Sequence, residues 1–208
     1  MINFPSSTVV QQRIPKEAFY KHLPLSASLK AKFVSDVDSI VVANSLPNKN
    51  LNLSTNSEIQ EIILLSISLK KQDFDGKIVE AIARQNPHEL VFLLIYEEKR
   101  QFALYHSKLY RTAWMSENDA TLSLNGNTLD EIWDDLVRQI AISSESVLQK
   151  KDENLDEQLK TQDEIDRLNK LIKKMERAAW KEQQPKKRFA LYAKLQEYKK
   201  ELEEITNG

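Results

Sequence analysis

The chain offers few residues whose types and spacing could carry out catalysis. It has no cysteine, which excludes disulfides, thiolate metal sites and cysteine nucleophiles. Its only glycines, Gly76, Gly126 and Gly208, lie too far apart to form a phosphate-binding or dinucleotide-binding loop. The three histidines have no paired spacing such as His-x-x-x-His, and no serine stands in a nucleophile elbow. We therefore expect no catalytic residue, no metal site and no cofactor.

A cluster of basic residues near the C-terminus is the strongest candidate for a binding site. Residues 170–188 hold eight basic and two acidic residues, whereas residues 152–166 hold one basic and seven acidic residues. Basic side chains around an aromatic residue suit contact with phosphates or with an acidic protein. The predicted binding residues are Lys170, Lys173, Lys174, Arg177, Trp180, Lys181, Lys186, Lys187 and Arg188. The alternative is that these charges only keep an exposed surface soluble.

Two helices with heptad patterns are expected to carry this basic segment. Apolar residues step by three and four from Ile165 to Ala179, and again from Leu191 to Ile205. A Gln-Gln-Pro sequence at residues 183–185 separates the two patterns and indicates a turn. The sequence therefore predicts an antiparallel helical hairpin, or short coiled coil, over residues 146–208, with the basic residues at its tip.

The preceding residues, 1–145, predict an α/β domain in which helices flank a central mixed β-sheet. The most apolar run, residues 90–96, is typical of a strand that is covered on both faces. Leu93 in its middle is therefore expected to be fully buried. Residues 61–70 predict a neighbouring strand, and the apolar stripe of residues 129–141 predicts a helix that packs on the sheet.

The order of these predicted elements resembles the core of restriction-endonuclease-like nucleases. The order is a helix (26–37), a strand (39–46), a short extended piece, a strand (61–70), a helix and a strand (89–96). The resemblance implies a nuclease domain, active or degenerate, as the alternative to a non-enzymatic protein.

The catalytic residues that this resemblance implies are incomplete in the sequence. In that family a carboxylate, one further residue and a lysine end the third strand, and an acid upstream completes a magnesium site. The matching residues here are Ser68 and Lys70, with Glu58 upstream. A serine cannot replace a carboxylate, because a hard dication prefers charged oxygen ligands. This departure argues against an active nuclease.

Five parts of the sequence form a recognisable combination: residues 13–20, residues 61–70, Trp114, residues 137–141 and the Lys- and Glu-rich C-terminal segment. Together they resemble a bacterial family named as domain of unknown function 4391. In that family an acidic residue often stands at the position of Ser68. Its members tend to be encoded beside helicases and DNA methyltransferases in restriction and phage-defence neighbourhoods, which implies an accessory role near nucleic acid.

Charge and hydropathy complete the sequence-based prediction. The net charge is −1, so any attraction to a polyanion must be local. The N-terminus lacks the pattern of a signal peptide, and the longest apolar run has seven residues, too few to span a membrane. We expect a cytoplasmic, non-enzymatic accessory protein whose basic tip docks a protein partner, such as a helicase or methyltransferase, or nucleic acid. The oligomeric state stays open.

Overall fold

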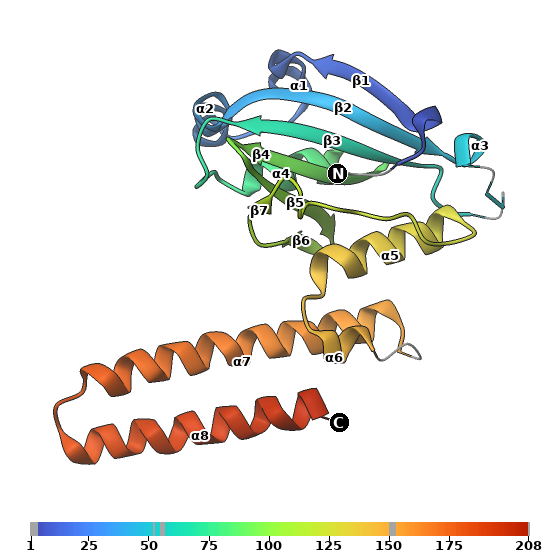
Figure 1. Cartoon of the computed structure of the whole chain (residues 1–208). Helices are drawn as coiled ribbons and strands as arrows, with labels where there is room; N and C mark the ends of the chain where they lie inside the picture. The colour runs from blue at the N-terminus through green and yellow to red at the C-terminus, as the bar shows by residue number, and fades with distance from the viewer. Residues whose placement is uncertain (1–3, 52, 55–56, 150–152, 208) are drawn as a thin grey trace. The chain divides into compact units, whose positions relative to one another are not determined.

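The computed structural model describes residues 4–51, 53–54, 57–149 and 153–207, and it divides into two compact units (Figure 1). Unit 1 comprises residues 1–141, and unit 2 comprises residues 142–208. Within the described ranges, no helix combines the length and the apolar character that crossing a membrane requires.

Unit 1 is built on a seven-stranded mixed β-sheet, which confirms the predicted fold class. The strands are β1 (Val9–Ile14), β2 (Val37–Pro47), β3 (Glu61–Leu69), β4 (Glu89–Tyr96), β5 (Lys99–His106), β6 (Lys108–Arg111) and β7 (Met115–Ser116). The sheet has the order β1-β2-β3-β4-β5-β6, and β7 pairs with β5. Strands β3 and β4 are parallel, as expected for strands joined through a helix, and the other pairs are antiparallel.

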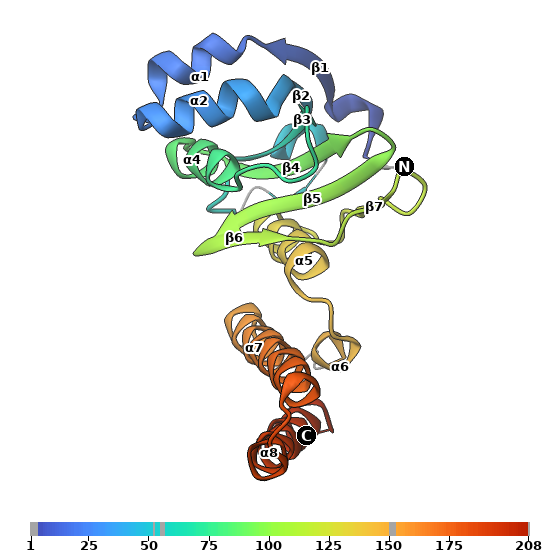
Figure 2. The same cartoon turned by 90° about the vertical axis from the view of Figure 1, so that its left-hand side faces the viewer.

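Helices cover the two faces of this sheet unequally (Figure 2). The helical elements of unit 1 are η1 (Ser6–Thr8), α1 (Lys16–His22), α2 (Ala27–Asp36), α3 (Asn48–Leu51), α4 (Lys77–Gln85) and α5 (Leu129–Ala141). Helices α1, α2 and α4 lie on one face, where Phe33, Ile78 and Phe92 belong to one buried cluster. Helix α5 lies on the other face and contacts β3, β5 and β6. It buries the apolar stripe that its sequence predicts, including Ile132, Trp133 and Leu136.

The prediction that Leu93 is fully buried is wrong. Side chains alternate between the faces of a strand, so Phe92 and Leu94 point to the face with α2 and α4, and both are 0% exposed. Leu93 points to the other face and is only partly buried. It lines a surface hollow of about 320 Å³ together with Ser66 of the neighbouring β3 and Val41 of β2. The apolar run correctly indicated a central strand, but one face of that strand is covered only in part.

The order of the strands also differs from the predicted order at one point. No strand occurs in the described residues between β2 and β3, where the short extended piece was expected; that connection contains α3. The antiparallel neighbour of β2 on its other side is β1, which comes from before α1 and α2. The pairing of Ile14 with Ile40 joins segments separated by two helices, which no local sequence pattern reveals.

Unit 2 is a helical hairpin preceded by a short helix. Its helices are α6 (Glu145–Leu148), α7 (Leu155–Lys181) and α8 (Pro185–Asn207). Helix α7 begins where the Asn154 side chain accepts a hydrogen bond from the backbone N–H of Glu157 (2.9 Å), and α8 begins at Pro185, whose missing N–H costs nothing in a first turn. Ile165, Leu168, Ile172 and Ala179 of α7 are buried, as the heptad pattern predicts, and so is Leu195 of α8.

Candidate functional site

The candidate site is the end of the hairpin where α7 and α8 are joined, and we call residues 170–192 the hairpin tip. All nine side chains predicted to bind lie in this segment, and each is exposed to solvent. The connection of residues 182–184 holds them close together, since it joins the C-terminal turn of α7 to the first turn of α8. The structure thus gathers the predicted binding residues at one end of unit 2.

The basic residues of the hairpin tip have no acidic partner among the described residues, whereas several basic residues further along the two helices do. Outside the tip, Arg167 pairs with Glu164 (2.5 Å), and Lys199 pairs with Glu176 of the tip (3.0 Å). None of the eight basic side chains of the tip forms an ion pair within the described residues. The two acids of the tip are engaged, because Glu176 binds Lys199 and Glu182 accepts the backbone N–H of Gln184 (2.9 Å).

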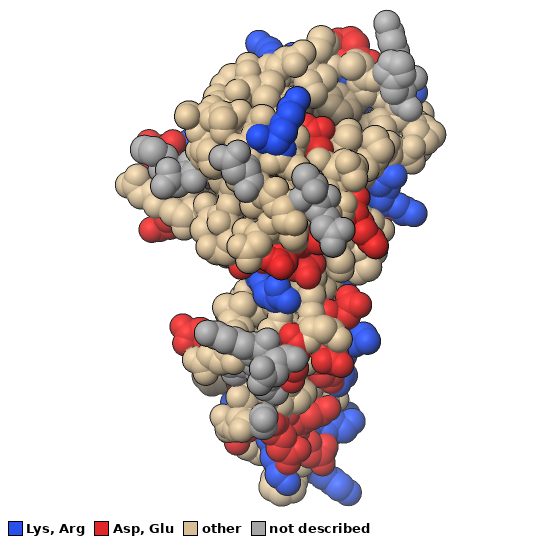
Figure 3. Space-filling model, turned by 90° about the vertical axis from the view of Figure 1, so that its right-hand side faces the viewer, with Lys and Arg blue, Asp and Glu red and all other residues tan. Residues whose placement is uncertain are grey.

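The tip therefore concentrates positive charge, whereas acidic residues outnumber basic residues in the rest of unit 2. Its eight basic and two acidic residues give it a formal charge of +6, although the whole chain has a charge of −1. The base of the hairpin differs in charge from the tip. Figure 3 faces the base and shows acidic and basic side chains intermingled there. Exposed, unpaired cations gathered in this way attract polyanions at long range.

Three aromatic side chains are exposed in the same segment. Trp180 is 88% exposed, Phe189 is 77% exposed and Tyr192 is 46% exposed. The other markedly exposed large apolar residues among those described are aliphatic and lie outside the tip. The sequence analysis identified Trp180 but missed Phe189 and Tyr192. The heptad pattern could have predicted their exposure, since both residues fall outside the apolar seam that contains Leu191 and Leu195.

The residues of the alternative nuclease site do not come together. Ser68 lies near the end of β3, and Lys70 follows that strand, where its Nζ donates a hydrogen bond to the carbonyl oxygen of Val34 (3.1 Å). Glu58 precedes the start of β3, so a strand of nine residues, about 30 Å at the usual rise, separates it from Lys70. No three His, Asp or Glu side chains in the described part of the chain are placed to hold a metal ion together.

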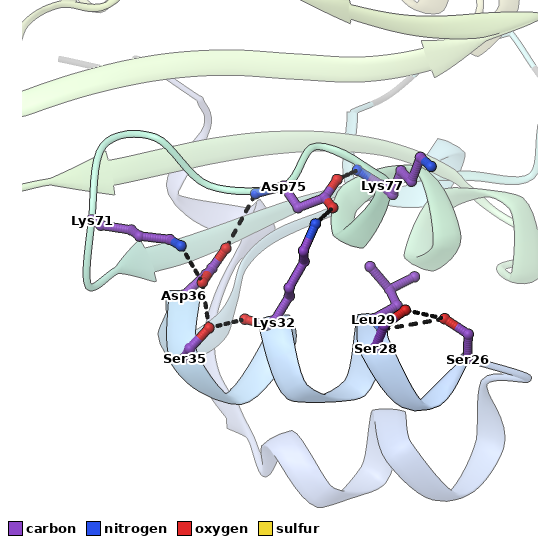
Figure 4. A network of polar contacts seen from close by, with 9 residues as sticks. All are labelled: Ser26, Ser28, Leu29, Lys32, Ser35, Asp36, Lys71, Asp75 and Lys77. Atoms are coloured by element: carbon purple, nitrogen blue, oxygen red, sulfur yellow. Dashed lines mark hydrogen bonds and ion pairs between the residues drawn. The ribbon is translucent and has the colours of Figure 1, made fainter.

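The end of β3 is held by a polar network around Asp36, which is the last residue of α2 (Figure 4). Asp36 is 1% exposed, and its carboxylate pairs with Lys71 (2.8 Å) and accepts hydrogen bonds from Ser35 and from the backbone N–H of Asp75. Burial by itself would raise the pKa of Asp36, but the hydrogen bonds from Lys71 and Ser35 outweigh it and lower the pKa. Every contact of this carboxylate is thus structural, and it fastens the loop after β3 to α2.

A second polar cluster surrounds a pocket of about 270 Å³ at the other end of the sheet. His88, Glu89 and His106 line it, so two of the three histidines converge although they lie far apart in the sequence. His88 Nε2 lies 3.6 Å from Glu61 Oε2. Burial raises the pKa of Glu89, and the nearby His106 opposes that rise. The cluster was not predicted, because pairing of β4 with β5 brings the two histidines together.

Glu89→Gln should stabilise the protein at pH 7. A carboxyl whose pKa is higher in the folded state disfavours folding once it ionises, and this cost is absent when both states hold the proton. The gain in melting temperature should therefore be present at pH 7 and should vanish below about pH 4, near the pKa of an unperturbed glutamate. Thermal unfolding of both proteins across this pH range measures it. A gain that persists unchanged at low pH would show that burial of the charge is not its cause.

The architecture defines a class of protein: a mixed α/β domain linked to a helical hairpin with a basic, aromatic tip. The chain belongs to the family described as Domain of unknown function (DUF4391), whose model matches residues 2–202. That match extends over both units. No curated protein and no solved structure matches the chain.

Proposed function

We propose that this protein is a non-enzymatic accessory protein that docks a polyanionic partner through its hairpin tip. The observation that carries the proposal is the set of eight exposed cations of the tip, none of which has a carboxylate partner among the described residues. Unpaired surface cations contribute little to stability, so they point to an interaction with a partner rather than to a structural role. The partner belongs to a bacterial DNA-processing or phage-defence assembly, and is a nucleic acid or an acidic surface on a helicase or methyltransferase.

Support for this reading over a nuclease comes from unit 1. Glu58 and Lys70 lie at opposite ends of β3, and Ser68 supplies no charged ligand. Asp36 is the buried acid in the polar network at the end of β3. Its carboxylate is already occupied by Lys71, Ser35 and a backbone N–H. Nothing in this arrangement favours hydrolysis of a phosphodiester.

Binding to heparin, a simple polyanion, tests the proposal. The tip variant changes Lys181, Lys186, Lys187 and Arg188 to Ala, all of which are exposed. The matched control changes Arg13, Lys30, Lys49 and Lys77 to Ala, which removes the same charge from exposed positions of unit 1. We expect the tip variant to elute from a heparin column at clearly lower salt than the control. Elution of both variants at the same salt would mean that the tip is not the docking surface.

A further inference from the structure

We infer that the hairpin tip binds single-stranded nucleic acid, stacking bases on Trp180, Phe189 and Tyr192 while the surrounding cations contact phosphates. This inference rests on the proposed function and names its partner. Proteins that bind single strands without sequence preference combine a basic surface with exposed aromatic side chains, since every base has a π-face. Both components are present here within residues 170–192.

Helix geometry places Trp180 and Tyr192 on one side of the hairpin, with Phe189 next to them at the outer edge of that side. Successive residues of an α-helix are rotated by about 100°, so Trp180 lies about 100° from the buried Ala179. Tyr192 and Phe189 lie about 60° and 120° from the buried Leu195, in the same rotational sense. In antiparallel helices that face each other, the same sense of rotation leads to one shared face.

An ion pair between the helices supports this assignment of faces. By the same rotation, Glu176 and Lys199 point toward the face that carries the aromatic residues, and their side chains are in contact at 3.0 Å. Lys173 and Arg177 precede Trp180 by seven and three residues, so they lie on the same side of α7. The face therefore presents aromatic rings with cations beside them.

The exposure of the rings favours a single strand over a duplex. A protein can stack on bases only where they are unstacked and unpaired, whereas a duplex offers phosphates and groove edges. Contact with duplex phosphates would use the cations and leave Trp180, at 88% exposed, without a role. Self-association through the same face is disfavoured because it would bring two tips of formal charge +6 together.

Binding of labelled oligonucleotides tests the inference, with mixed-sequence DNA of about 20 nucleotides as the probe, single-stranded or annealed to its complement. The aromatic variant changes Trp180, Phe189 and Tyr192 to Ala. The matched control changes Val10, Val34 and Leu148 to Ala, which are exposed apolar residues outside the tip. Circular dichroism should show that both variants stay folded, because all six side chains are exposed.

We expect the wild-type protein to bind the single strand more tightly than the duplex. The aromatic variant should lose at least about tenfold in affinity for the single strand, since stacking of each base contributes on that scale, and its affinity for the duplex should not change. Equal affinity of wild type and aromatic variant for the single strand, or tighter binding of the duplex, would overturn the inference. Either result would leave the heparin comparison intact, so the docking role of the tip would stand with a different partner.

Discussion

Phe92→Ala will lower the free energy of unfolding of unit 1 by about 3–5 kcal/mol. Phe92 is 0% exposed and stands in the middle of β4, between β3 and β5. Its ring belongs to the cluster that α2 and α4 cover, where Phe33 and Ile82 are also buried. Truncation removes the burial of the ring and leaves a cavity, because the surrounding side chains come from several elements and cannot all move inward.

Leu93→Ala is the matched control, since it changes the next residue of the same strand on the opposite, partly covered face. We expect it to cost less than about 2 kcal/mol, because a partly exposed side chain loses less burial and leaves no closed cavity. Urea unfolding followed by tryptophan fluorescence in a Trp180→Phe background reports on unit 1, where Trp114 and Trp133 remain. A cost for Phe92→Ala no greater than that for Leu93→Ala would contradict the assignment of the two faces.

The elements with strong local patterns could be predicted from the sequence. Residues 89–96 form β4, and the apolar stripe of α5 is buried. Ser26 caps α2 by accepting the N–H of Leu29 (3.2 Å), as a serine before an apolar helix indicates. These features follow from the spacing of neighbouring residues, which the sequence displays directly.

Features that depend on contacts between distant residues could not be predicted. The coverage of Leu93 depends on how far α5 extends over the sheet, and the pairing of β1 with β2 joins segments on either side of two helices. The contact of Asp36 with Lys71 likewise joins residues that are close only after folding. No local pattern of apolar or charged residues specifies such contacts.

The hairpin tip lies between these two cases. Its basic residues are contiguous in the sequence, and the heptads locate the turn between them. The absence of acidic partners for these residues among those described, and the exposure of Phe189 and Tyr192 in the same segment as Trp180, required the structure. The sequence thus indicated where to look, and the structure adds the unpaired charge and the aromatic face.

Replacing Lys181, Lys186, Lys187 and Arg188 by Ala will reduce the affinity for single-stranded DNA and its dependence on salt. Each phosphate contact to a single strand releases counterions and contributes about 0.7 to the slope of log K against log salt. Loss of four such contacts should lower the magnitude of the slope by up to about 3. Of the variants proposed, this one should lose the most affinity. The melting temperature should stay nearly unchanged, since the four side chains are exposed and unpaired within the described residues.

The most direct measurement is therefore the salt dependence of binding, compared between the wild-type protein, this tip variant and the Arg13, Lys30, Lys49 and Lys77 control. The docking role of the hairpin tip predicts a shallow slope and weak binding for the tip variant alone, with the control close to wild type. Equal slopes and equal affinities for all three proteins would contradict it, and the working surface would have to be sought outside the hairpin tip.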